Sequence, residues 1–332
     1  MHKTGSTAIQ HALADYDDGH TFYPTLSPEP NHSFAIAAHF GDMVLQHVKG
    51  KPGYTSDELE RAFKSLVERS LKRRRVIVYA EYVSAPMSVE GKQRLLEYLF
   101  CCFKNMHVHM YSREPLSWVG SAVSQRVREG HNISSSNLAV RYRDRLEFWE
   151  DQLGLENISV ADYHKSSAEF GSVVRHFEDL LGIKLRPQLS DATPLQSLPW
   201  TVVRVLSNFN RIRTKRDAQT DAAIRWDVLV LLSKAYAGSP TLSREDLLGC
   251  VDCPLEEVDF LKRFDIHYDS SRIEPRSEAH LFSQLRDISD IKLDPLIAAM
   301  EQDGIRVPKS RHHESLLKHL EAHFSSKMTR SK

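Results

Sequence analysis

The chain has few cysteines, and their pattern argues against the usual cysteine-based sites. The four cysteines form an adjacent pair, Cys101-Cys102, and a Cys-x-x-Cys pair, Cys250 and Cys253. No second pair and no nearby histidines at ligand spacing complete a zinc site. Adjacent cysteines at the end of an apolar helix are typical of buried, reduced thiols. We therefore expect neither a zinc centre nor redox chemistry.

The chain also lacks an excess of charge of either sign. Lysine and arginine together number 44, as do aspartate and glutamate, so the formal net charge is zero. This balance predicts no general attraction to nucleic acid or to a membrane surface. We interpret the basic runs at 72–75 and 211–216 as solvated helix ends, although an acidic polysaccharide could use the second. The 17 histidines are scattered, and no metal site is predicted.

A long apolar run is the third absence. No stretch approaches the roughly 18 apolar residues of a membrane-spanning helix, and no signal-peptide pattern is present. We therefore expect a soluble, cytoplasmic protein. The 332 residues are enough to bury a large core, as one α/β domain with or without a helical extension.

What the chain does have is a polar loop at its start that leads into an amphipathic helix over 7–14. Lys3 carries a full positive charge, Gly5 lets the backbone approach a ligand closely, and Ser6 and Thr7 supply hydroxyls. Backbone N–H groups and the dipole at a helix N-terminus attract an anion. The loop therefore indicates a phosphate site, although a plain turn with a helix cap has the same composition.

A second segment, residues 106–131, predicts a strand, a turn and a helix. Pro115 suits the first helical position, where its missing N–H has no cost. Arg113 then follows the carboxyl end of the strand, where open parallel sheets bind ligands. Ser121 comes eight residues later on the helix. An arginine fork and a hydroxyl suit a phosphate monoester, whereas a surface Arg–Glu pair and a helix serine are the alternative.

Together the two segments resemble sulfotransferases that use 3′-phosphoadenosine-5′-phosphosulfate (PAPS). That family has a first loop of the form KTGTT and a later strand–turn–helix of the form REP with a serine eight residues on. The likeness is to bacterial carbohydrate-type members, and it extends weakly to about residue 215. The resemblance implies that the 3′-phosphate of PAPS is bound by Arg113 and Ser121. It implies that the 5′-phosphosulfate is bound by the first loop, which comprises Lys3, Thr4, Gly5, Ser6 and Thr7.

The stretch 75–86 predicts a β-branched strand with Glu81 at its carboxyl end. In similar glycan sulfotransferases a glutamate just after this strand, in a pattern like FEKS, serves as general base, so the resemblance gives Glu81 that role. This chain has Tyr82-Val83-Ser84 where many relatives carry lysine and serine, so one supporting cation is missing from the pattern. A carboxylate that caps the next helix is the alternative interpretation.

The resemblance implies in-line transfer of a sulfuryl group from PAPS to a hydroxyl of a carbohydrate or a small hydroxylated acceptor. Glu81 would accept the hydroxyl proton, and Lys3 would stabilise the leaving 5′-phosphate without a metal. Two rival functions stay open. A P-loop kinase is disfavoured because Lys3 precedes Gly5 and no earlier glycine exists. A degenerate, non-catalytic nucleotide-binding protein is the second rival.

The patterns predict an α/β fold of the P-loop-like, three-layer type with a central parallel sheet. We expect a PAPS-binding domain over 1–190 and a mostly helical region over 191–332, packed on the same domain, with the proline-rich stretch 184–200 between them. An inward apolar stripe is expected over 170–181. The other expected helices cover 32–48, 55–72, 89–104, 116–129 and 136–153, and the expected strands cover 75–80, 106–112 and 157–163. Asp57, or Ser56 just before it, is expected to cap the helix over 55–72, and Ser88 with Lys92 to open the helix over 89–104.

One feature departs from the family pattern. The first loop should follow a buried central strand, yet only Met1 precedes His2. A parallel sheet without its middle strand leaves unpaired backbone groups and an apolar slot. We therefore expect the first strand to lie upstream of this sequence, and its restoration to raise both thermal stability and PAPS affinity.

Overall fold

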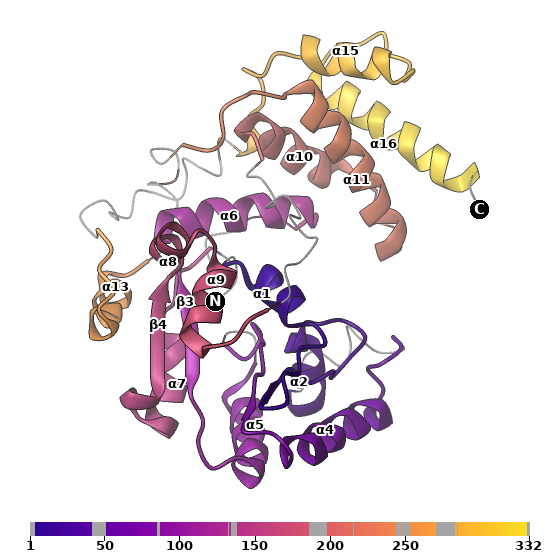
Figure 1. The fold of residues 1–332 in the computed structure, drawn as a ribbon. Helices are drawn as coiled ribbons and strands as arrows, with labels where there is room; N and C mark the ends of the chain where they lie inside the picture. The colour runs from indigo at the N-terminus through magenta and orange to yellow at the C-terminus, as the bar shows by residue number, and fades with distance from the viewer. Residues whose placement is uncertain are drawn as a thin grey trace. The chain divides into compact units, whose positions relative to one another are not determined.

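The chain folds as a mixed α/β protein that is mostly helical (Figure 1). The computed structural model describes residues 4–41, 51–84, 87–131, 133, 138–185, 198–214, 216–243, 247, 253–269, 283 and 285–330. The chain divides into two compact units. The first comprises Met1–Arg113, Arg141–Pro194 and Glu256–His267, and the second comprises Glu114–Val140, Leu195–Leu255 and Tyr268–Lys332. The expected boundary at 190/191 lies outside the described residues.

The first unit holds every strand of the described chain. Its N-terminal half contains α1 (Ser6–Leu13), β1 (Thr21–Phe22), α2 (His32–Phe40), α4 (Ser56–Ser70), β2 (Arg75–Val76), α5 (Val89–Cys102) and β3 (Val108–Ser112). It continues with α7 (Arg143–Leu153), η2 (Leu155–Asn157), β4 (Ile158–Asp162), α8 (Tyr163–Phe170), α9 (Val173–Leu181), α13 (Leu255–Leu261) and η3 (Lys262–Phe264).

The described strands form two separate parallel sheets, and the single central sheet that the sequence predicts is not confirmed. β1 pairs with β2 through two residue pairs, and β3 pairs with β4 from Val108↔Ile158 to Ser112↔Asp162. The strand expected over 75–80 ends at Val76, because β1 offers it only two partners and no second strand of the described chain pairs with it. The strands expected over 106–112 and 157–163 are confirmed.

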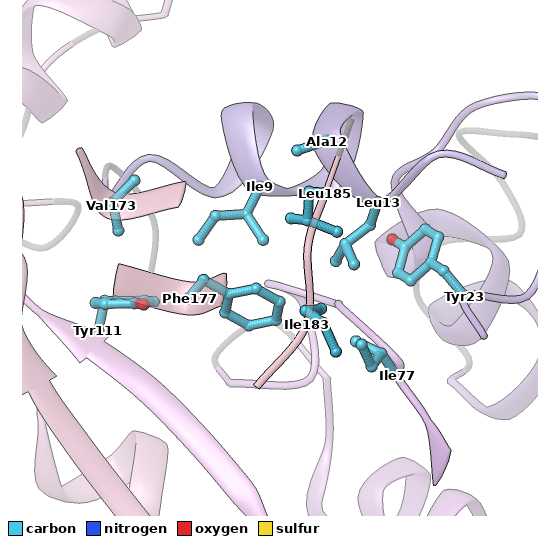
Figure 2. Packing of buried hydrophobic residues seen from close by; sticks show 10 residues of the cluster. All are labelled: Ile9, Ala12, Leu13, Tyr23, Ile77, Tyr111, Val173, Phe177, Ile183 and Leu185. Carbon is cyan, nitrogen blue, oxygen red and sulfur yellow. The ribbon is translucent and has the colours of Figure 1, made fainter. Parts of the chain in front are cut away.

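One apolar cluster joins the parts of the first unit (Figure 2). Ile9 and Leu13 of α1 point toward Phe177 of α9 and toward Ile77, which follows β2. Ile183 lies between Phe177 and Ile77, and the cluster also contains Ala12, Tyr23, Tyr111, Val173 and Leu185. Both sheets therefore contribute to one core, although no strand links them. Burying such side chains contributes roughly 1.5–3 kcal/mol each relative to exposure.

Local signals set most helix starts, with some corrections. Ser88 caps α5 through the Gly91 N–H, and Pro115 opens its helix, as predicted. Thr55, rather than Ser56 or Asp57, caps α4, because its hydroxyl and the Glu58 side chain form a reciprocal capping box.

Other predictions in the first unit differ from the structure. The helix expected over 136–153 begins only at Arg143, and the one expected over 32–48 is described as far as Phe40. Leu180 is exposed, so the stripe over 170–181 is narrower than predicted, with Val173 and Phe177 buried. Cys101 is exposed because α5 buries Leu95 and Leu96 instead, so the expectation of a buried thiol is wrong there.

All of the regular elements described in the second unit are helices. It contains α6 (Pro115–Arg128), α10 (Trp200–Ile212), α11 (Ala218–Ala235), α15 (Asp294–Gln302) and α16 (His313–Arg330). The helix α11 packs against each of the other four. A buried ion pair between Arg213 and Asp221 joins the end of α10 to the first turn of α11. Among the described helices, none combines the length and the apolar character that crossing a membrane requires.

Candidate functional site

The turn at the start of α1 is built around a glycine in the left-handed conformation. Gly5 has a φ of 73°, in the left-handed region that favours glycine. Thr4 and Ser6 are buried, with exposed fractions of 0% and 5%, whereas Thr7 is exposed. Gly5 is the N-cap residue of α1 and has no side chain with which to accept a hydrogen bond from the first helical turn. Lys3 lies outside the described residues.

Two neighbours from later in the chain confine Gly5. A Cβ at this position would lie 2.5 Å from Cγ1 of Val173 and 3.2 Å from Cε2 of Tyr163. Val173 is the first residue of α9 and Tyr163 the first of α8. Both the backbone conformation and the close packing therefore require glycine here.

Glu81 lies directly against this turn. The hydroxyl of Ser6 donates a hydrogen bond to Oε1 of Glu81. The N–H of Glu81 donates to Oγ of Ser33 at 2.8 Å, and its carbonyl oxygen accepts from both the N–H and the hydroxyl of Ser84, at 3.0 and 2.7 Å. Hydrogen bonds on both sides of the residue thus fix the carboxylate beside the first turn of α1.

The residues before Glu81 are fixed by a buried histidine. His32 is fully buried and stacks on Tyr23, with ring centroids 4.1 Å apart. Its Nδ1 accepts from the N–H of Tyr79 at 3.3 Å, so Nε2 carries the proton and donates to the carbonyl oxygen of Pro24 at 2.7 Å. Burial lowers the pKa of His32 to about 4. Burial, with Glu81 nearby, raises the pKa of Tyr79 well above its ordinary value, so this hydroxyl keeps its proton.

Arg113 follows β3 directly, as the sequence predicts, and its guanidinium lies over an aromatic ring. The Cζ of Arg113 is 5.3 Å from the ring centroid of Tyr163. The parallel register explains this contact, because Ser112 pairs with Asp162 and the next residues of both strands emerge side by side. Tyr163 therefore contacts Arg113 and also borders Gly5.

Two cations from neighbouring helices lie beyond the Glu81 turn. Arg145 of α7 donates from Nη1 to Oγ of Ser84 at 3.3 Å. Lys92 of α5 has its Nζ 5.8 Å from the ring centroid of Phe148, also on α7. Burial is the main cause that lowers the pKa of both cations, and repulsion by Arg145 lowers that of Lys92 further.

The structure thus brings several of the predicted site residues together within the first unit. Gly5, Ser6 and Glu81 share one locus, and Tyr163 connects it to Arg113. Ser121 is half-buried on α6 and belongs to the second unit. No group of three histidine, cysteine, aspartate or glutamate side chains in the described part of the chain could hold a metal ion.

Sequence reasoning missed three residues here. Tyr163 had a usable signal, because it stands directly after β4 as Arg113 stands directly after β3. Lys92 and Arg145 had no such signal, because each is one polar position on an amphipathic helix and is buried only where α5 meets α7.

Comparison of the chain with family models, with curated proteins and with solved structures finds no match.

Proposed function

We propose that the protein is a sulfotransferase that moves a sulfuryl group from PAPS to a hydroxyl of a carbohydrate or a related acceptor. The observation that carries the proposal is the hydrogen bond from Ser6 to Glu81. It puts the carboxylate proposed as the base against the loop proposed as the donor cradle. A base must lie within hydrogen-bond reach of the hydroxyl that attacks the donor, so the two parts have to adjoin.

The proposed reaction needs one proton acceptor and one set of anion donors. Glu81 takes the proton of the acceptor hydroxyl while the new S–O bond forms. The bond from sulfur to the bridging oxygen of the 5′-phosphate breaks, and its electron pair leaves with adenosine 3′,5′-bisphosphate. The amides of the first turn of α1 and the charge of Lys3 stabilise that leaving group. The proposal assigns the 5′-phosphosulfate to residues 3–7 and the 3′-phosphate to Arg113 with Ser121.

The position of Arg113 supports the proposed site for the 3′-phosphate. Its guanidinium is kept near the loop by Tyr163, which borders Gly5. A donor bound at both places would span two anion sites within the first unit. The proposal also implies the finer architecture of a P-loop-like, three-layer domain, in which one more parallel strand would stand between β2 and β3.

Two measurements test this function. Calorimetry compares adenosine 3′,5′-bisphosphate with ATP–Mg²⁺, and we expect the bisphosphate to bind more tightly; tighter binding of ATP–Mg²⁺ would favour a kinase. Incubation with radiolabelled PAPS and a panel of sugars and glycans should give a labelled product. Bisphosphate binding without transfer to any acceptor would contradict catalysis and favour a non-catalytic nucleotide-binding protein.

A further inference from the structure

Lys92 and Arg145 are two buried cations whose charges nothing in the described chain neutralises directly. Their exposed fractions are 4% and 7%. Neither forms an ion pair with a carboxylate of the described residues, and Nε of Arg145 is buried without a hydrogen-bond partner. Long cationic side chains are almost never fully buried unless they are paired. This pair is therefore an exception that needs an explanation.

The nearest acidic groups do not supply one. Asp144, Glu257 and Glu81 attract Arg145 at longer range, but none accepts a hydrogen bond from it among the described residues. Asp144 is exposed to solvent. The Glu257 carboxylate accepts from the N–H of Arg143 at 2.8 Å, and that of Glu81 accepts from Ser6. Glu257 and Glu81 thus each accept a hydrogen bond from another described donor.

The electrostatic consequence is a site that attracts an anion. Removing a cation from water without pairing it has a large free-energy cost, and two such cations repel each other. Burial lowers the pKa of both groups, and the repulsion by Arg145 lowers that of Lys92 further. An anion placed between them would relieve both effects. The donor set, a planar guanidinium with an unused Nε–H and an ammonium, suits a carboxylate or another oxyanion.

The order of contacts indicates which molecule brings this anion. Ser6 contacts the Glu81 carboxylate, the Glu81 carbonyl contacts Ser84, and Ser84 contacts Arg145. Glu81 therefore separates the loop proposed for the donor from the two cations. We propose that Lys92 and Arg145 bind an anionic group of the acceptor, so that the preferred acceptor is a sugar that carries a carboxylate. This inference rests on the proposed function and names the substrate class of that site.

The first test needs neither PAPS nor turnover. Thermal unfolding of the full chain is measured with glucuronate and, as the matched neutral sugar, with glucose. We expect glucuronate alone to raise the melting temperature, and we expect Lys92→Met and Arg145→Met each to weaken its binding by about tenfold or more. Lys64→Met, which removes an exposed lysine of α4, should leave the binding unchanged.

The same variants separate a ligand site from a structural role. Because Lys92 has no described counter-charge, Lys92→Met should melt at the same temperature as the unliganded wild type or above it. A clear loss of stability in Lys92→Met without ligand would overturn the inference, as would equal shifts with glucose and glucuronate. The remaining measurement is the binding of adenosine 3′,5′-bisphosphate to the same variants. If Lys92→Met weakens its binding and leaves that of glucuronate unchanged, the cations belong to the donor, and the inference is wrong.

The outcome is independent of the proposed reaction. Selective glucuronate binding without sulfate transfer would support the anion site and contradict the sulfotransferase. Transfer to neutral and carboxylated sugars at equal kcat/KM would support the sulfotransferase and contradict the anion site.

Discussion

The hydroxyl of Ser6 donates a hydrogen bond to the carboxylate of Glu81, although the two residues lie 75 positions apart in the chain. Ser6 opens α1, and Glu81 begins the turn that is anchored by Ser33 and Ser84. The contact holds the first turn of α1 and the Glu81 turn next to each other within the first unit.

Replacing Glu81 with glutamine should remove the base and leave the shape of the site. We expect sulfate transfer to fall about 100- to 10,000-fold, the range for loss of a general base, with adenosine 3′,5′-bisphosphate bound as before. The measurement is the rate of label transfer from PAPS at saturating acceptor. Glu97→Gln, an exposed position on α5, is the control. Equal rates for wild type and Glu81→Gln would remove this residue from the mechanism.

Gly5→Ala should lower the free energy of unfolding for two separable reasons. A left-handed alanine costs about 1–2 kcal/mol, and the overlap with Val173 adds about 1–3 kcal/mol of overpacking. Gly171→Ala is the matched control, because Gly171 has a φ of 77° but open space around its Cβ position. Urea unfolding should therefore show the larger loss in free energy of unfolding for Gly5→Ala.

The double variant Gly5→Ala/Val173→Ala separates the two costs further. Removing Cγ1 of Val173 relieves the overlap but not the backbone strain, so a double-mutant cycle should give a favourable coupling of about 1–3 kcal/mol. A coupling near zero would show that the loop does not pack on α9 in the way described.

Arg113→Met should weaken the binding of one phosphate only. If Arg113 binds the 3′-phosphate, affinity for adenosine 3′,5′-bisphosphate should fall about 10- to 100-fold, as expected for a charged hydrogen-bond donor. Affinity for adenosine 5′-monophosphate should not change. Calorimetry with both nucleotides gives the comparison, and Arg61→Met on the exposed face of α4 is the control. Parallel losses for the two nucleotides would contradict this role.

His32 should make the stability of the protein depend on pH below neutrality. Its folded pKa is about 4, below the ordinary value near 6.5, so between these values the unfolded chain binds the proton and the folded chain does not. The free energy of unfolding should therefore fall as the pH drops from 6.5 toward 4, by up to about 1.4 kcal/mol per pH unit from this residue. The slope from this residue fades above pH 6.5, as the unfolded chain also loses the proton.

Urea titrations at several pH values of the wild type and His32→Gln give the measurement. The difference between the two isolates the contribution of His32, because His109, whose pKa burial lowers to about 3, adds to the slope in both proteins. His11→Gln, at an exposed position of α1, should keep the full slope. A slope in His32→Gln as steep as that of the wild type would contradict the assignment of a neutral, Nε2-protonated imidazole.

Features that depend on a few neighbouring residues were predictable. Pro115 places the start of α6, Ser88 caps α5, and β3 ends at Ser112 as expected, so that Arg113 follows its last residue. Thr55 shows the limit of such reasoning: three polar residues in a row could each cap α4, and only the reciprocal bond with Glu58 selects Thr55.

Features that depend on distant segments were not predictable. The strand over 75–80 has the right β-branched composition, yet it shortens to Arg75–Val76 because pairing depends on a partner strand and not on composition. The proximity of Tyr163 to Gly5 required the parallel register of β3 and β4 and the packing of α9 against α1.

The sequence alone determined the helical segments, the strand that delivers Arg113 and the glycine-containing turn, since hydrophobic periodicity and capping act over a few residues. Only the tertiary structure decided that Ser6 contacts Glu81 and that Lys92 and Arg145 are buried without a described counter-charge. A hydrogen bond across 75 residues and the desolvation of a charge depend on which faces pack together, and that is a property of the whole core.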